Sequence, residues 1–222
     1  MRLKKFLLSL AAISLVANTL LAISGNGRPG TIASGNGSTT INSMQLSSAE
    51  IDTLLFMREE EKVARDVYLE MYALWQHPVF SNIASSEQNH MDAVAALLDK
   101  YNLADPVVDD SVGVFTNDRL FDMYQELVLR GQVSLTEALY SGAYIEETDI
   151  RDLENAIART RHNDIVNVYE NLLSGSRNHL RAFVGQIEAL GIAYEAQVLL
   201  QWEVDLILSE PMERTGSLHR GR

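Results

Sequence analysis

Four long stretches of the chain repeat apolar residues at alternating steps of three and four, and polar residues interrupt each repeat near its middle. Within residues 48–75 the repeat runs Leu54, Met57, Glu61, Ala64, Tyr68 and Met71. Residues with this spacing lie on one face of an α-helix. Because no segment shows the two-residue alternation of a half-buried strand, the pattern predicts an all-α fold in which four helices pack their apolar faces together.

The predicted helix ends rest on capping signals. Ser47 and Ser134 each precede a glutamate by three residues, which is the form of a capping box. Asn163-Asp164 can cap a later helix, which Gly191 would end. We predict helices over residues 48–75, 80–103, 117–130, 134–161, 165–190 and 195–209. The expected architecture is a four-helix bundle with a short helix in the crossover and a C-terminal helical extension.

The first 24 residues have the composition of a secretory signal. Three basic residues precede an apolar run from Phe6 to Ala17, and small residues follow. The run is short for a bilayer span, which needs about 20 residues, so we predict a signal peptide that is cleaved. An uncleaved anchor that reaches Ile23 is the alternative. The sequence therefore predicts export to the periplasm or out of the cell, with no stable membrane insertion after cleavage.

The rest of the chain divides by composition. Residues 25–46 are dominated by Gly, Ser, Thr and Asn, and such a segment is too polar to pack, which predicts a flexible linker. We expect the helical bundle at residues 47–209 and a polar tail at residues 210–222.

Composition also limits the chemistry and the partners. The chain contains no cysteine, which excludes disulfides, iron–sulfur clusters and thiolate ligands and leaves oxygen and nitrogen donors for a metal. Its 30 acidic and 18 basic side chains give a net charge of −12, which repels a phosphate backbone. We therefore expect no nucleic-acid partner.

The polar residues on the inward helix faces are mainly acids and imidazoles. A lone carboxylate in a bundle core is costly unless it pairs, takes up a proton or binds a cation. Since all four long helices place such groups at mid-height, we expect a bound cation. These donors suit iron or manganese, with zinc as an alternative, whereas calcium would leave the imidazoles unused. The predicted metal ligands are Glu61, Glu87, His90, Glu146, Asp149 and His179.

Several of these segments resemble known proteins. Residues Glu61 to Tyr68 resemble the first helix of rubrerythrin-type ferritin-like proteins, and Glu87-Gln88-Asn89-His90 resembles their Glu-x-x-His motif. The stretch from Arg58 to Phe183 is also similar to an uncharacterised bacterial and archaeal family of ferritin-like proteins, through residues 145–150 and 175–183. The resemblance implies a ferritin-like bundle around a di-iron carboxylate site.

The resemblance also implies a role for each ligand. Glu61 and Glu146 would be terminal carboxylates, and Glu87 would bridge the two metal ions. His90 and His179 would be the two imidazole ligands.

Two positions on the third and fourth long helices complete the comparison with the ferritin-like pattern. Asp149 would match an extra acid that rubrerythrins have on the third helix. Ser176 departs from the pattern, which has a second bridging glutamate there. Because a hydroxyl is a poor bridge, the resemblance implies a two-metal site that is asymmetric or weakly occupied on one side, or a single metal ion.

Several charged residues near the predicted ligands are not themselves predicted to bind metal. Glu59, Glu60 and Lys62 belong to a charge run, which predicts a solvated helix face. For Arg65 and Arg177 two interpretations stay open: pairing with the ligand carboxylates, or exposure at the surface.

Two classes of function fit these observations. The first is a di-iron oxidoreductase of peroxidase or oxidase type, in which iron held by carboxylates and imidazoles reduces dioxygen or peroxide. Without cysteine there is no built-in rubredoxin-type relay, so we expect a separate electron donor. The second is an exported bundle that binds metal without catalysis or has a purely structural role. A homodimer is compatible with either class.

Overall fold

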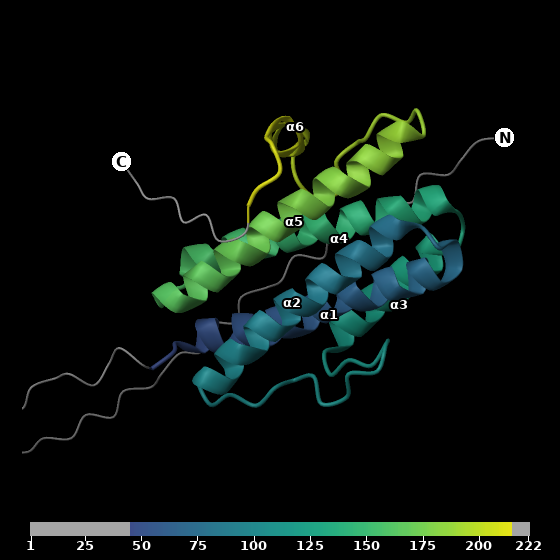
Figure 1. Cartoon of the computed structure of the whole chain (residues 1–222). Coiled ribbons are helices and arrows are strands. Elements are labelled where there is room, and N and C mark those ends of the chain that lie inside the picture. The colour runs from purple at the N-terminus through teal and green to yellow at the C-terminus, as the bar shows by residue number, and fades with distance from the viewer. Residues whose placement is uncertain (1–44, 215–222) are drawn as a thin grey trace, which may run out of the picture. The chain divides into compact units, whose positions relative to one another are not determined.

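The computed structural model describes residues 45–214 and confirms the predicted all-α fold, since no strand occurs in that range (Figure 1). None of its helices combines the length and the apolar character that crossing a membrane requires. The predicted signal at residues 1–24 and nearly all of the predicted linker lie outside the described residues. The six helices are α1 (Ser48–Trp75), α2 (Pro78–Lys100), α3 (Asp118–Gly131), α4 (Leu135–Arg159), α5 (Asn163–Ala189) and α6 (Gln201–Ser209).

Capping explains where α1 and α2 begin and end. Ser47 and Glu50 form the predicted capping box at the start of α1. The helix stops at Gln76, whose φ of 51° is left-handed. Helix α2 begins at Pro78, two residues before the predicted start, because proline suits the first helical turn, where its missing N–H is not needed.

Of the two remaining long helices, α4 has the predicted cap and α5 does not. Ser134 caps α4 as predicted, by accepting a hydrogen bond from the backbone N–H of Glu137. The predicted cap of α5 is wrong, because the helix begins at Asn163 after His162, with no side-chain cap. Asp164 instead accepts hydrogen bonds from the hydroxyl of Tyr101, which ties α5 to the end of α2.

The helices pack as two hairpins. Helices α1 and α2 form one, α4 and α5 form the other, and α3 lies beside α1, while α6 crosses α5 (Figure 1). An aromatic cluster joins the hairpins at one end of the interior. There the ring of Tyr68 lies 5.1 Å from that of Phe183, which lies 5.7 Å from that of Phe80.

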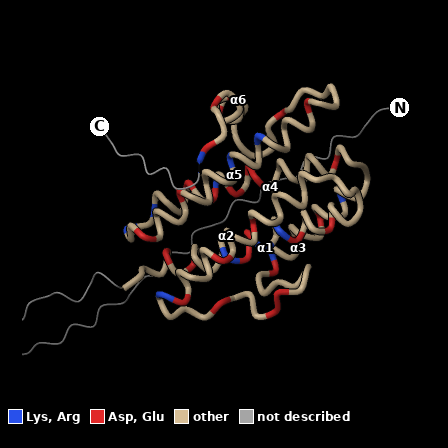
Figure 2. Tube along the Cα trace, in the orientation of Figure 1, with Lys and Arg blue, Asp and Glu red and all other residues tan. Residues whose placement is uncertain are grey.

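An acidic loop between α2 and α3 covers the outer side of α1 (Figure 2). Lys62 is 0% exposed and donates a 2.8 Å hydrogen bond to the carbonyl of Ser111 in this loop. The backbone N–H of Thr116 donates a 2.6 Å hydrogen bond to Glu59. The predicted solvated face of Glu59, Glu60 and Lys62 is therefore wrong, because all three side chains are buried.

The C-terminal helix is shorter than predicted. Helix α6 begins at Gln201, because the chain before it is held in an irregular path by Glu147 of α4. The Glu147 carboxylate accepts hydrogen bonds from the Tyr194 hydroxyl and from the backbone N–H groups of residues 197–199. A buried acid on α4 thus anchors the segment that leads to α6.

Candidate metal centre

The predicted ligands are all buried in the middle of the bundle. One comes from α1, two from α2, two from α4 and one from α5, so each long helix contributes. Their helical spacing explains this, since each belongs to the inward repeat of its helix. The six side chains are Glu61, Glu87, His90, Glu146, Asp149 and His179.

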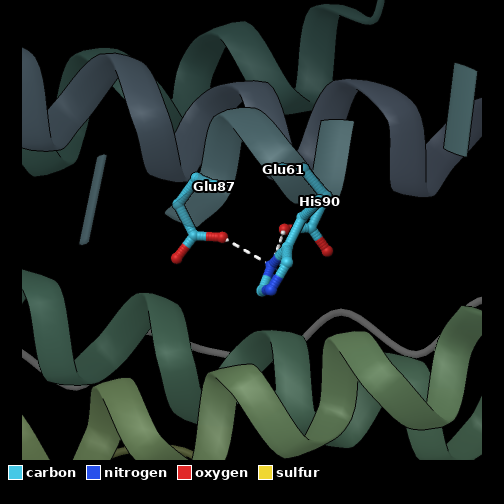
Figure 3. A group of neighbouring side chains, drawn as sticks. All are labelled: Glu61, Glu87 and His90. Atoms are coloured by element: carbon cyan, nitrogen blue, oxygen red, sulfur yellow. Dashed lines mark hydrogen bonds and ion pairs between the residues drawn. The ribbon is translucent and has the colours of Figure 1, made fainter. Parts of the chain in front are cut away.

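The first group of ligand-like atoms belongs to the α1–α2 hairpin. Glu61, Glu87 and His90 each offer one atom, and these atoms lie within 4.8 Å of one another. The Nδ1 atom of His90 lies 2.8 Å from Oε2 of Glu87 and 3.1 Å from Oε2 of Glu61 (Figure 3). Glu87 and His90 are three residues apart on α2, so one helical turn aims both side chains at the same point.

The second group combines both hairpins. Glu87, Glu146 and His179 also offer atoms within 4.8 Å of one another. Nδ1 of His179 lies 2.8 Å from Oε1 of Glu87 and 3.5 Å from Oε2 of Glu146. Glu87 therefore belongs to both groups, with one carboxylate oxygen toward each histidine.

Several atoms of these groups have no hydrogen-bond partner. Oε1 of Glu61, Oε1 of Glu87 and Nδ1 of His179 are all buried without a hydrogen-bond partner. The last two lie 2.8 Å apart without the geometry of a hydrogen bond. Native proteins pair nearly all buried polar atoms, so these atoms fit a bound cation that would accept their lone pairs.

Burial and mutual charge set the proton affinities of the centre. Burial raises the pKa of Glu61 to about 7, and Glu87 adds to the rise. Burial would also raise the pKa of Glu87, but His179 and His90 outweigh this effect and lower that pKa. Burial opposes the charged form of His179, yet Glu87 and Glu146 raise its pKa to about 10. Without a metal ion, protons therefore supply the positive charge that the carboxylates need.

Asp149 lies outside both groups. Its Oδ2 accepts a hydrogen bond from the hydroxyl of Ser176, and its Oδ1 has no partner. The structure thus brings five of the six predicted ligands into two groups and places the sixth beside them. Ser176 stands where the ferritin-like pattern has glutamate. Its hydroxyl is hydrogen-bonded to Asp149 and to the carbonyl of Leu172.

Three further residues position the ligands. The hydroxyl of Tyr68 donates a 2.5 Å hydrogen bond to Oε1 of Glu146. Oγ of Ser86 lies 2.9 Å from Nε2 of His179. Gly175 lies against the His90 ring, and a Cβ atom there would be 2.5 Å from Nε2. Sequence reasoning missed Ser86 and Gly175, although each lies one helical turn before a predicted histidine ligand.

The two arginines near the centre do not contact the ligand carboxylates. Arg65 is buried and donates hydrogen bonds to Asp66, Gln88 and the carbonyl of Asp110. Arg177 pairs with Glu213, beyond the end of α6. Neither interpretation open for Arg65 is right, because it is neither exposed nor paired with a ligand. Pairing of Arg177 with the ligands is likewise wrong.

Known proteins are similar to this chain in sequence and in fold. The family model for an uncharacterised protein domain (DUF2202) matches residues 50–211, which include every residue of both groups. The uncharacterised protein MJ0754 of Methanocaldococcus jannaschii is 50% identical over 169 residues, or 76% of this chain and 91% of that protein. A crystal structure of the hypothetical protein MJ0754 from Methanococcus jannaschii is similar with a TM-score of 0.75 at 50% identity, over 76% of this chain and 97% of that chain.

Proposed function

The chain belongs to the DUF2202 family, and from that premise and the geometry of the centre we propose that it is a ferritin-like protein that binds two iron ions. Glu61 and Glu146 would each hold one ion from the outer side. His90 and His179 would hold them from the α2 and α5 sides. Manganese or zinc would use the same donors.

One observation supports this proposal above the others: the position of Glu87. Its two carboxylate oxygens lie 2.8 Å from Nδ1 of His90 and 2.8 Å from Nδ1 of His179. A carboxylate that joins two imidazole-containing groups matches a bridging ligand between two cations. A purely structural core would satisfy its buried oxygens with hydrogen bonds, whereas Oε1 of Glu61 has no hydrogen-bond partner and Glu87 faces His179 as an ion pair without hydrogen-bond geometry.

The proposed activity is the reduction of dioxygen or peroxide. Iron in the ferrous state supplies the electrons for such a reaction when it is bound. The side chains of this protein hold the ligands in place and exclude water, and the Tyr68 hydroxyl fixes Glu146 by its hydrogen bond. Electrons would then come from a separate donor. We propose that the reaction takes place in the periplasm or outside the cell, as residues 1–24 suggest.

Metal analysis of Glu87→Gln tests the proposed centre. The wild-type chain should bind two ions, and Glu87→Gln should lose one or both, because a neutral amide is a poor bridge. Glu59→Gln is the matched control, since Glu59 is equally buried on α1 but hydrogen-bonded to Thr116. If Glu87→Gln retained both ions, the proposed centre would be wrong.

A second candidate function is metal binding without catalysis. The hydrogen bond from Ser176 to Asp149 favours it, because α5 has this serine where a second bridging carboxylate would be needed to join the two groups. Addition of peroxide to the ferrous protein separates the candidates. Rapid oxidation with two irons per chain supports the oxidoreductase, whereas one tightly held ion without turnover supports the non-catalytic protein.

A further inference from the structure

A groove on the outer side of the second hairpin has no part in the proposed metal centre. It has a volume of about 560 Å³ and is lined by none of the six predicted ligands. Its lining comes from α4, from α5, from α6 where that helix crosses α5, and from the chain after α6 (Figure 1). Because binding sites are mostly apolar with a few well-placed polar groups, the lining residues indicate what such a groove would bind.

The apolar part of the lining continues from the groove onto the surface. Trp202 and Leu206 of α6 are 62% and 56% exposed, and Met212 after the helix is 62% exposed. Large apolar side chains that gather at one exposed place mark interaction sites, and Trp and Met are enriched in protein interfaces. A small molecule in the groove would leave this apolar rim in water, whereas a protein segment would cover both the groove and the rim.

The polar part of the lining is mainly acidic, with four carboxylates and two guanidinium groups. Both guanidinium groups pair with Glu213, whose Oε2 lies 2.6 Å from Nη2 of Arg177 and whose Oε1 lies 3.2 Å from Nη2 of Arg181. The other three carboxylates form no ion pair with any residue that the structure describes. They belong to Glu154, Glu203 and Glu210.

Two of these acids lie close enough to repel each other. Burial raises the pKa of Glu154, and the charge of Glu203 adds to the rise, while Arg177 opposes it. Glu154 belongs to α4 and Glu203 to α6, so the two like charges enter the groove from different helices. A cationic group placed between them would remove the repulsion and form charge-assisted hydrogen bonds with both carboxylates.

From the apolar rim and the acidic lining we infer that this groove is the docking site for a basic amphipathic segment of a partner protein. Apolar side chains of the segment would cover Trp202 and Leu206, and its Lys or Arg side chains would pair with Glu154 and Glu203. A second copy of this chain fits the groove less well, because its net charge is −12 and like charges that meet at an interface are costly. The inference does not depend on the proposed metal centre.

The fluorescence of Trp202 measures the binding directly. The chain has two tryptophans, and Trp75→Phe leaves Trp202 as the one that is observed. The probe is an amphipathic helical peptide of leucine and lysine, and the control peptide has glutamate in place of each lysine. We expect the lysine peptide to shift the Trp202 emission to shorter wavelength and to bind at least tenfold more tightly than the glutamate peptide.

Variants of the groove separate docking from a general attraction to an acidic protein. Glu154→Gln combined with Glu203→Gln should weaken binding of the lysine peptide roughly tenfold, as expected for the loss of two ion pairs at a protein surface. Leu206→Gln should also weaken it, because the apolar contact is lost. Glu188→Gln is the matched control, since it removes an exposed charge of α5 that does not line the groove, and it should bind as the wild type does.

Several results would overturn the inference. Equal affinity for the lysine and glutamate peptides would refute the acidic docking site, and so would equal losses in the groove variants and in Glu188→Gln. A wild-type dimer in analytical ultracentrifugation that Leu206→Gln converts to a monomer would assign the groove to a second copy. Tighter peptide binding by the full chain with Arg220→Ser and Arg222→Ser would assign it to residues 215–222 of the chain itself.

Discussion

At the scale of the residue, the centre depends on side chains that touch the ligands as much as on the ligands themselves. Gly175 of α5 is the clearest case, because the His90 ring occupies the space where a side chain would begin. Any larger residue must displace the ring from Glu61 and Glu87.

We predict that Gly175→Ala loses metal from the group of Glu61, Glu87 and His90. The added Cβ would lie 2.5 Å from Nε2 and 2.6 Å from Cε1 of His90, so the ring must move. Metal analysis should show about one ion per chain less than in the wild type. The group at His179 should keep its ion.

Gly185→Ala is the control for this prediction. It lies on the same helix, and a Cβ there meets nothing within 4 Å. It should retain full metal content and gain up to about 1 kcal/mol in free energy of unfolding, from the better helix propensity of alanine. Full metal content in Gly175→Ala would contradict the positioning role of this glycine.

The sequence predicts the identity of the ligand-like residues better than the burial of their neighbours. Glu61, Glu87 and His90 stand out because an acid or imidazole interrupts an otherwise apolar repeat. Glu60 and Lys62 lie off that repeat, and a charged residue off the repeat is normally solvated. Here the loop between α2 and α3 covers Lys62 by a hydrogen bond from its ammonium group to the carbonyl of Ser111, and helix periodicity contains no information about a loop that folds back.

At the scale of the element, the start of α1 is tied to the turn between α4 and α5. Glu50 accepts hydrogen bonds from the backbone N–H groups of Ser47 and Arg161, and its Oε1 lies 2.8 Å from Nδ1 of His162. Although burial opposes it, these bonds lower the pKa of Glu50 to about 2. One carboxylate thus caps a helix and clamps a distant turn.

We predict that Glu50→Gln makes the protein less stable above pH 4.5 and less sensitive to acid below it. Because the pKa of Glu50 is lower in the folded state, its stabilising effect is fully present above its ordinary value of 4.5. That effect is lost as the pH falls toward 2. Free energies of unfolding measured across this range should converge for the two proteins. Parallel curves would show that the clamp does not depend on the charge of Glu50.

Helix boundaries follow the local signals with three instructive exceptions. The capping box at Ser47 is confirmed, and Ser134 caps α4, although the Glu137 carboxylate binds Arg130 and does not complete the box. Pro78 starts α2 earlier than predicted, which its place in the first turn explains. The start of α5 and the late start of α6 at Gln201 depend on tertiary contacts of Asp164 and Glu147, which local sequence does not reveal.

At the scale of the whole molecule, the sequence periodicity predicts the all-helical fold. It does not predict how the two hairpins pack against each other across the centre. Glu87 contacts a histidine of its own helix and one of α5. Only the packed bundle brings these together, which makes the candidate metal centre and the global fold interdependent.

We predict that metal stabilises the protein more strongly as the pH rises from 6 to 9. In the metal-free protein the pKa values of Glu61 and His179 are raised to about 7 and about 10. The stability they contribute is present at low pH and is lost as the pH rises through these values. Metal binding displaces the same protons and is favoured at high pH.

Thermal unfolding with and without Co²⁺ at several pH values measures this effect. At a fixed free metal concentration that is 100 times the Kd at pH 6, each bound ion should add about 2.7 kcal/mol to the free energy of unfolding at that pH. The difference between metal-free and loaded midpoints should widen with pH. A difference that is constant across the range would show that these protons are not exchanged for metal.

The division of the centre between the hairpins also bears on biosynthesis. Glu61, Glu87 and His90 all lie in the hairpin of α1 and α2, which leaves the ribosome before α4 and α5 are made. Three of the five grouped donors are therefore complete while translation continues, whereas Glu146 and His179 arrive later. The order of synthesis gives the nascent chain one open cluster of donors, which the second hairpin closes when it docks.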